Sequence, residues 1–440
     1  MKKKIVILTL SLCMLLSGCG GEQPAGSAVG QSSAQREHST AEQAPAQTKY
    51  SPTESPSAAS AQPEHSPTEH PPAASPQTEQ SPTEPPAAPT EPAPAGTQTA
   101  PSGQGPSDTE EPAADYDFKV CFAGDINLAE GWSTTVFLNQ QENGIYDCIS
   151  EELTDIMNAA DIMCLNNEFT YSTGGAPLAG KAYTFRALPE RVEILHQLGV
   201  DAVTLANNHV YDYGKDALLD TFAVLQEAGI PYFGAGHDLE EAMAPLYLEA
   251  DGKTIALVGA SRAEKNRMTP QATETEPGIL RCYDTTLYKE AIAEAKANAD
   301  FCIAFVHWGT EYSFDLEQVQ LDTGREYLDA GADVVIGAHS HCLQGMEFYQ
   351  GKPIIYSLGN YWFNEKTLDT MLVQLHISGD ADRSNIEVEI IPAVQTDCRT
   401  IYAEQEEEQR RIFDFLEEIS VNVEITDEGI VREKTAPVSQ

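Results

Sequence analysis

The chain has 440 residues and a formal net charge of −42 at neutral pH, with 68 Asp and Glu against 26 Lys and Arg. Residues 1–116 hold 13 of the acidic and 5 of the basic side chains, so residues 117–440 alone carry a net charge of −34. An acidic chain of this kind is repelled by the phosphate backbone, which excludes a general nucleic-acid-binding protein.

Residues 1–18 have the pattern of an export signal. A basic start precedes an apolar stretch over residues 5–16, which is too short to span a bilayer. It closes in Leu16-Ser17-Gly18-Cys19, which resembles a bacterial lipobox with cleavage before Cys19 and lipid on its sulfur. The alternative is an ordinary signal peptide with an incidental cysteine. We expect lipidation of Cys19 and an extracytoplasmic domain that is lipid-anchored to the cell membrane.

Residues 19–116 are rich in Pro, Ala, Ser, Thr, Gln and Glu, with hardly any large apolar side chain. The motif Ser51-Pro52-Thr53-Glu54 returns at residues 66–69 and 81–84. Such units offer no apolar face for stacking and cannot offset chain entropy, so we expect a disordered spacer rather than a solenoid.

Residues 117–440 show the apolar periodicity of a domain with a core. Strands alternating with helices are typical of an α/β layered fold. We expect strands at residues 118–123, 161–165, 201–205, 231–233, 254–259, 301–306 and 333–336. Helices are expected near 145–159, 188–198, 215–228, 284–298 and 316–330. Antiparallel strands of a second sheet are expected at 346–349, 353–357, 371–377 and 386–391, then a helix over 405–419 and a hairpin within 421–431.

The seven cysteines of this region form no C-x-x-C pair, and seven is an odd number, so we expect no disulfide framework. Cys121, Cys164 and Cys302 lie in expected buried strands and are interpreted as packing residues. Cys342 lies beside His341, where a packing role and a role as ligand or nucleophile are both open.

Side chains with metal-binding chemistry directly follow five of the expected strands. Ligands of an open α/β sheet bind beyond the carboxyl ends of its strands, so these side chains predict one shared site. Carboxylate, amide and imidazole groups together fit Mn, Fe or Zn better than Ca or Mg. The candidates are Asp125, Glu168, Asn208, His209, His307, His339 and His341.

Each candidate also has a purely structural interpretation. Asn208 can ligate a metal and His209 can protonate a leaving group, but both could also belong to an ordinary turn. His339 and His341 share a face if their segment is extended. The carboxylate of Glu168 could bridge two cations or pair with Arg186, and Asp125 could cap a helix.

The ordered motifs resemble those of bacterial capsule-synthesis proteins of the CapA/PgsA type, which are involved in poly-γ-glutamate production. The resemblance covers about residues 118–435 and implies a relation to calcineurin-like metallophosphoesterases, with a four-layer αββα sandwich. The motifs that carry it are Gly124-Asp125-Ile126-Asn127-Leu128, Asn166-Asn167-Glu168, Ala206-Asn207-Asn208-His209, Phe185-Arg186, His307-Trp308-Gly309, Gly337-Ala338-His339-Ser340-His341 and Tyr356-Ser357-Leu358-Gly359-Asn360.

This resemblance also implies roles. Asp125 and His341 would bind a first metal, Glu168 would bridge, and His209 would be the general acid. Asn208, His307 and His339 would bind a second metal. If the domain is an enzyme, we expect Arg186 to steady an anionic substrate. Two departures bear on these roles. Asn127 stands where the wider phosphoesterases have a metal-binding His, and Glu168 stands where they have Asp.

Two main hypotheses follow. In the first, the domain is a hydrolase that holds one or two Mn, Fe or Zn ions and activates water against a phosphoester, or an amide of a cell-surface polymer. In the second, it is a non-catalytic partner of a poly-γ-glutamate synthase or exporter. A solute-binding or cell-wall-binding lipoprotein is a third, weaker hypothesis.

Overall fold

The computed structural model describes residues 116–264, 267–380 and 382–434. The expected export signal, the lipid site at Cys19 and nearly all of the expected spacer lie outside the described residues, while Tyr116 already opens strand β1. Within the described ranges, no helix is both long enough and apolar enough to cross a membrane.

The larger sheet has ten strands, with parallel strands in one half and antiparallel strands in the other. β1 (Tyr116–Ile126), β2 (Ile162–Asn167), β5 (Ala202–Thr204) and β6 (Tyr232–Phe233) run parallel. β16 (Leu368–Gly379) joins the other side of β1 in antiparallel orientation. The remaining strands are β15 (Asn360–Trp362), β17 (Ser384–Thr396), β18 (Arg399–Tyr402), β19 (Val423–Ile425) and β20 (Ile430–Glu433).

The smaller sheet has six strands in the order β13-β14-β12-β11-β9-β8. β9 (Lys253–Ser261), β11 (Phe301–His307), β12 (Val334–Ala338) and β14 (Lys352–Leu358) are parallel. β8 (Leu246–Ala250) and β13 (Leu343–Tyr349) close its two edges in antiparallel orientation. Two short pairs complete the strands: β3 (Thr170–Tyr171) with β4 (Arg186–Ala187), and β7 (Ala235–Gly236) with β10 (Gly278–Ile279).

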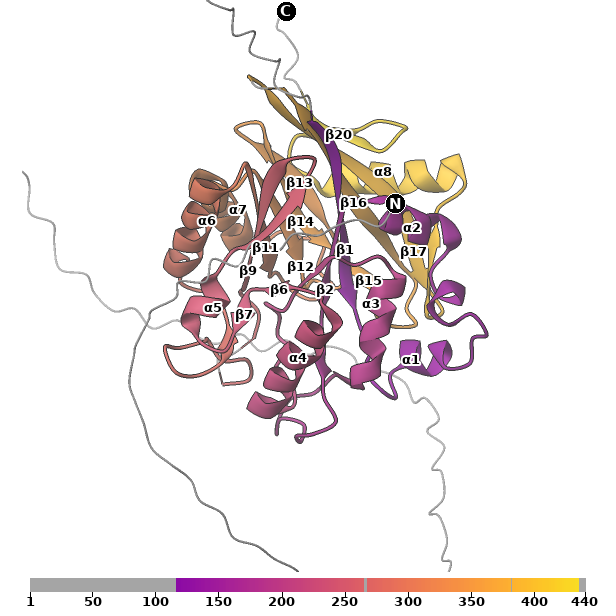
Figure 1. Ribbon diagram of the computed structural model, residues 1–440. Helices are drawn as coiled ribbons and strands as arrows, with labels where there is room; N and C mark the ends of the chain where they lie inside the picture. The colour runs from indigo at the N-terminus through magenta and orange to yellow at the C-terminus, as the bar shows by residue number, and fades with distance from the viewer. Residues whose placement is uncertain (1–115, 265–266, 381, 435–440) are drawn as a thin grey trace, which may run out of the picture. The chain divides into compact units, whose positions relative to one another are not determined.

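Helices cover the outer faces of the two sheets, and Figure 1 shows α6 and α7 on one side and α2 and α3 on the other. They are α1 (Ser133–Leu138), η1 (Gly144–Asp147), α2 (Glu151–Ala159), η2 (Pro189–Val192), α3 (Glu193–Gln197), α4 (Gly214–Ala228), α5 (Leu239–Met243), α6 (Thr286–Asn298) and α7 (Gln318–Asp329). A further helix, α8 (Glu406–Ile419), instead packs Ile412, Phe413 and Leu416 into the core that the two sheets share.

The alternation of side chains along the strands explains this layering. In β1, Cys121 and Ala123 pack into the core under the helices, whereas Val120 and Phe122 point the opposite way. Val120 and Phe122 share a second core with residues of the smaller sheet such as Phe305. The opposite face of the smaller sheet forms a third core with α6 and α7. Successive residues of a strand face opposite sides, so two sheets and two helix layers enclose three cores. The predicted α/β four-layer αββα sandwich is confirmed.

The prediction of a separate C-terminal sheet is wrong. β13 and β14 extend the smaller sheet, whereas β16 and β17 extend the larger one, where β16 pairs with β1 over eight residue positions. Local alternation predicts a strand but not its distant partner, because pairing between remote strands is set by how the whole faces match. The expected helices 145–159 and 188–198 are each divided into a short 3₁₀ turn and an α-helix.

Candidate metal centre

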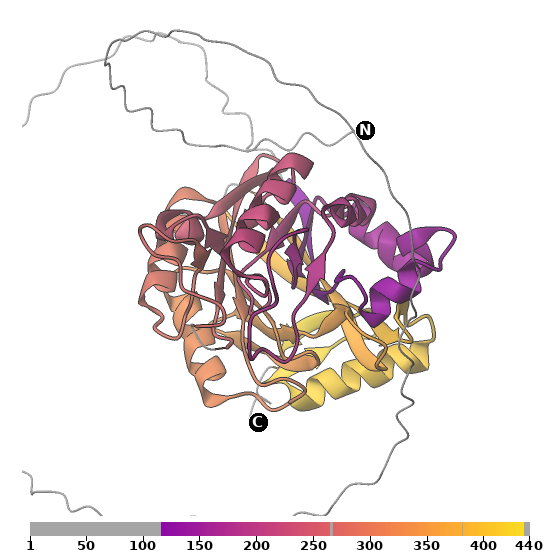
Figure 2. The same ribbon diagram turned by 90° about the horizontal axis from the view of Figure 1, so that it is seen from below.

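The carboxyl ends of the parallel strands of both sheets meet at one edge, seen from below in Figure 2. Asp125 lies near the end of β1 and Glu168 directly follows β2. His307 is the last residue of β11, and His339 directly follows β12. All of them are buried. These predicted side chains therefore lie together at one edge, with donors contributed by both sheets.

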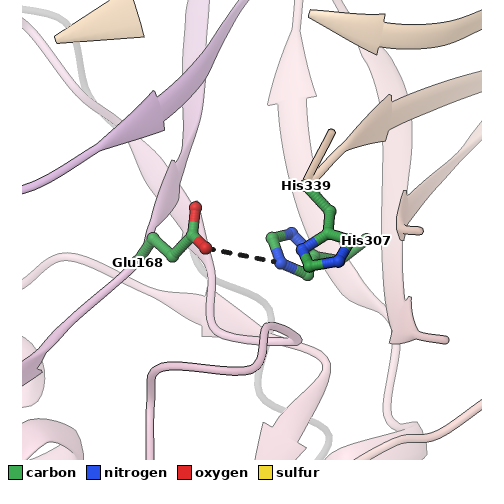
Figure 3. Close-up of side chains that lie close together, drawn as sticks. All are labelled: Glu168, His307 and His339. Atoms are coloured by element: carbon green, nitrogen blue, oxygen red, sulfur yellow. Dashed lines mark ion pairs between the residues drawn. The ribbon is translucent and has the colours of Figure 1, made fainter. Parts of the chain in front are cut away.

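One set of donors, which we call the His307 group, consists of Glu168, Asn208, His307 and His339. His307 Nε2 lies 2.7 Å from Asn208 Oδ1 and 3.6 Å from Glu168 Oε1. Glu168, His307 and His339 each offer one donor atom, and these three atoms lie within 4.8 Å of one another. Figure 3 shows the Glu168 carboxylate facing the two imidazoles. Four oxygen and nitrogen donors thus surround one small space.

A second set, which we call the His341 group, consists of Asp125, Glu168 and His341, again with donor atoms within 4.8 Å of one another. His341 Nδ1 contacts Asn360 Oδ1 at 2.8 Å and Asp125 Oδ2 at 3.3 Å. His341 Nε2 is left facing Glu168 Oε1 at 4.0 Å. The two groups share Glu168, which is the arrangement a bridging carboxylate requires.

Asn166 organises both groups, a role that sequence reasoning missed. Its amide nitrogen donates to Asp125 Oδ1 at 2.7 Å and to Glu168 Oε2 at 3.3 Å. Its oxygen accepts from Asn207 Nδ2 at 2.9 Å. Such contacts orient the ligands and leave their other oxygens free. The run of Asn166, Asn167 and Glu168 at the end of an apolar strand is the signal that could have pointed to it.

The segment that carries His339 and His341 is a turn, so the expectation of an extended segment is wrong. Both residues have left-handed backbone conformations, with φ of 95° for His339 and 55° for His341. Such φ values are costly for non-glycine residues and cluster at functional sites. The turn sends one imidazole to each donor group, whereas an extended chain would have sent both to the same side.

Close packing of two backbones places Asp125. A Cβ added to Gly124 would lie 2.0 Å from the carbonyl oxygen of Gly359, so only glycine fits there. That carbonyl accepts the backbone N–H of Asp125 at 3.0 Å. The start of the Gly359-Asn360 segment is thereby attached to the end of β1, next to the Asn360 side chain that contacts His341.

His209 belongs to a buried chain of polar contacts beside the cluster. Its Nδ1 contacts Asp212 Oδ2 at 2.7 Å, and its Nε2 lies 3.9 Å from Glu168 Oε1. Asp212 Oδ1 pairs with Lys181 Nζ at 2.6 Å, and Lys181 also donates to the backbone oxygen of Asn208. A carboxylate on one ring nitrogen fixes the tautomer and aims the other nitrogen. Lys181 was missed in the sequence because a lone lysine in a loop carries no periodic signal.

Arg186 and Asn127 have structural contacts at the rim of the cluster. The Arg186 guanidinium donates to Gly174 O at 2.8 Å and lies 4.3 Å from the centre of the Tyr213 ring. In the described ranges it forms no ion pair with Glu168, so that structural alternative is not realised. Asn127 Oδ1 accepts from the backbone N–H of Ala129 at 2.8 Å, which uses its oxygen in a local turn.

The electrostatics of the cluster fit a bound cation. Three potential metal-ligand atoms of the two groups are buried without a hydrogen-bond partner among the described residues: Asp125 Oδ2, which has only the ion-pair contact with His341, Glu168 Oε1 and His339 Nδ1. Burial, followed by the nearby charge of Asp125, raises the pKa of Glu168 well above its usual value. Burial lowers the pKa of His339 to about 3 and that of His307 well below its usual value. Neutral imidazoles and uncompensated carboxylates are suited to a divalent metal ion.

The remaining candidates pack or pair away from the cluster. Burial raises the pKa of the Cys342 thiol to about 11, and its sulfur contacts Ser313 O, so a packing role fits this residue. Every cysteine of the described ranges is buried and free. His237 pairs with Glu241 and His376 with Glu389, so both have structural contacts.

Comparison with known proteins decides the family. Residues 119–365 match the family described as "Bacterial capsule synthesis protein PGA_cap". The chain belongs to this family. It is 33% identical over 237 residues to the PGA biosynthesis protein CapA of Bacillus subtilis (strain 168), covering 52% of this chain and 61% of that protein. It is also 33% identical over 221 residues to the capsule biosynthesis protein CapA of Bacillus anthracis, covering 49% and 52%.

The matched part thus spans between half and two thirds of these relatives' own lengths. Among solved structures, a hypothetical protein from Thermus thermophilus aligns with a TM-score of 0.37 and 17% identity, over 63% of this chain and 99% of that one. Within the PGA_cap chain described here, every predicted metal ligand belongs to one of the two donor groups, and both groups are suited to divalent metal ions.

Proposed function

We propose that this PGA_cap protein is an extracytoplasmic, metal-dependent phosphoester hydrolase of capsule or poly-γ-glutamate biosynthesis, anchored to the cell membrane by lipid on Cys19. The observation that carries the catalytic part is the convergence of four buried donors around Glu168 Oε1, an oxygen without a hydrogen-bond partner in the described ranges. A mixed set of imidazole, amide and carboxylate donors favours Mn, Fe or Zn over Mg or Ca.

In this proposal, the donors fall into two sites that share a bridge. Asn208, His307 and His339 would hold one ion with Glu168, and Asp125 and His341 would hold a second ion. Ions at such sites lower the pKa of a bound water and polarise the phosphoryl oxygens. Every one of these donors is buried.

His209 is the proton donor of the proposed reaction. Asp212 holds the Nδ1–H, so the transferable proton is present on Nε2, which faces the cluster, when the ring is doubly protonated. Burial lowers the pKa of His209, and the Asp212 carboxylate partly offsets this. As the water oxygen bonds to phosphorus and releases one proton to solvent, the P–O bond to the leaving group breaks and the Nε2 proton passes to the leaving oxygen.

Purified full-length protein tests the proposal. We expect near-stoichiometric Mn, Fe or Zn and hydrolysis of a generic phosphodiester that His209→Ala reduces by about 100-fold or more at unchanged metal content. His376→Ala is the matched control, because that histidine pairs with Glu389 away from the cluster. A protein that purifies without metal and regains no activity when Mn, Fe or Zn is added would contradict the proposal.

Asn127 favours a second candidate function, a non-catalytic partner of a polymer synthase or exporter. Its amide oxygen already accepts the N–H of Ala129, so it contributes no imidazole to the His341 group. A cell that produces normal polymer with His209→Ala, at normal protein level, would favour this candidate. Loss of polymer with His209→Ala at normal protein level would favour hydrolysis.

A further inference from the structure

A pocket of about 230 Å³ opens directly onto the metal centre, with His209 and His341 among its lining residues. Each of these imidazoles touches an aromatic wall. The Phe185 ring lies 4.4 Å from His209, and the Phe363 ring lies 4.6 Å from His341, centre to centre. A group attached to a reacting phosphoryl group would therefore enter a space enclosed by aromatic side chains.

The aromatic side chains of this pocket pack against one another in its interior and are exposed at its opening. The Trp132 indole N–H donates to Phe363 O at 2.6 Å, and the Trp132 ring meets Phe185 at 4.9 Å. Phe185 and Phe363 are buried, whereas Tyr183 is 62% exposed and Tyr312 is 42% exposed. Exposed aromatic side chains around a concave site are a common feature of ligand recognition.

The rings of this wall are not parallel. Trp132 and Tyr183 meet at 79°, Trp132 and Phe185 at 66°, and Phe185 and Phe363 at 87°. A flat nucleobase is usually held against a parallel ring face. A wall of mutually tilted rings suits a thicker, puckered ring whose C–H faces pack against several aromatic surfaces.

The polar rim points to a ligand with hydroxyl donors and few negative charges. Glu311 and Glu365 supply two carboxylates, whereas Lys366 is the one lysine or arginine of the lining among the described residues and lies 3.6 Å from the centre of the Tyr312 ring. Carboxylates are strong acceptors for hydroxyl groups. The same carboxylates repel a row of anionic groups, which the chain's charge of −42 reinforces.

We propose that this pocket binds the sugar ring of a glycosyl phosphate or of a phosphodiester-linked glycan. The inference rests on the proposed phosphoester hydrolysis and specifies its substrate class. It places a glycan, rather than the polyanionic polymer itself, beside the metal centre. Sugar hydroxyls reach Glu311 and Glu365, and the apolar faces of the ring lie against the tilted aromatic side chains.

Tryptophan fluorescence of the full chain reports binding to this pocket, because Trp308 and Trp362 are buried and Trp132 lines it. Glucose 1-phosphate is expected to bind at least about tenfold more tightly than methyl phosphate, which lacks the ring. The double variant Tyr183→Ala/Tyr312→Ala should erase this advantage. Tyr146→Ala, a tyrosine of similar exposure outside the pocket, should retain it.

Three results overturn the inference. The first is no advantage of glucose 1-phosphate over methyl phosphate. The second is binding of AMP more tightly than glucose 1-phosphate, which would assign the pocket to a nucleobase. The third is binding of a γ-linked glutamate oligomer more tightly than glucose 1-phosphate. Methyl glucoside separates this inference from the proposed function, since it carries no phosphate. If it binds wild type and not the double variant while the protein lacks metal and hydrolytic activity, the sugar pocket stands and the hydrolase proposal fails.

Discussion

The His307 group and the His341 group share Glu168 but differ in completeness. The His307 group gathers an amide oxygen and two imidazoles around that carboxylate, supplied by both sheets. The His341 group has only Asp125 and His341 beside it, because Asn127 after β1 directs its amide oxygen to the backbone of Ala129. We infer from this difference one strong and one weaker metal site within a single cluster.

The largest expected effect follows from removing an imidazole of the stronger site. His307→Ala should weaken binding of the ion in the His307 group by more than about 100-fold, which exceeds the effect of removing a residue that only orients a ligand. The ion in the His341 group should be depleted too. Metal analysis after dialysis against a weak chelator measures this. His376→Ala should keep the wild-type content. Equal metal in His307→Ala and wild type would show that the His307 group is not the stronger site.

His341→Ala should affect one ion only. The ion in the His341 group should bind more than about 100-fold more weakly, which exceeds the effect of removing a residue that only orients a ligand. Affinity for the ion in the His307 group should change by less than about threefold. Calorimetric titration of metal-free protein should then show one binding step in place of two. Loss of both steps would mean that the two groups act as one inseparable site, and the comparison would fail.

Lys181→Met should act through contacts rather than through a lost ligand. Lys181 pairs with the buried Asp212 and donates to the backbone of Asn208, so its loss should cost about 3–5 kcal/mol of folding stability. Affinity for the ion in the His307 group should fall by about 10–100-fold. Chemical denaturation and metal titration measure the two effects. Lys289→Met, at an exposed pair with Glu326, should change stability by less than about 1 kcal/mol. Equal losses in both variants would refute a special role for Lys181.

Asn127→His should give the smallest change, a gain. An imidazole directly after β1 should strengthen binding of the ion in the His341 group by about tenfold, while losing the Asn127–Ala129 hydrogen bond costs about 1 kcal/mol of stability. A two-step titration in which only the weaker step moves would support the comparison. An unchanged weaker step would show that position 127 does not limit the His341 group.

Much of the fold follows from sequence patterns, because strands buried on both faces, such as Phe301–His307, have continuous apolar runs with clear ends. The partners of the C-terminal strands do not follow, since β16 finds β1 from more than 240 residues away. The ligands themselves could be found because each stands at a strand end. The supporting role of Lys181 could not, since it reaches the cluster only through side-chain contacts between distant segments.

The most direct measurement of the central claim is the metal content of purified full-length protein, compared between wild type and Glu168→Gln. Glu168 is the one donor shared by both groups, and its Oε1 lies within 4.0 Å of His209, His307 and His341. Wild type should hold at least one tightly bound divalent transition-metal ion per chain, and Glu168→Gln should lose it. Equal metal content in the two proteins, or none in wild type after exposure to Mn, Fe and Zn, would contradict the account.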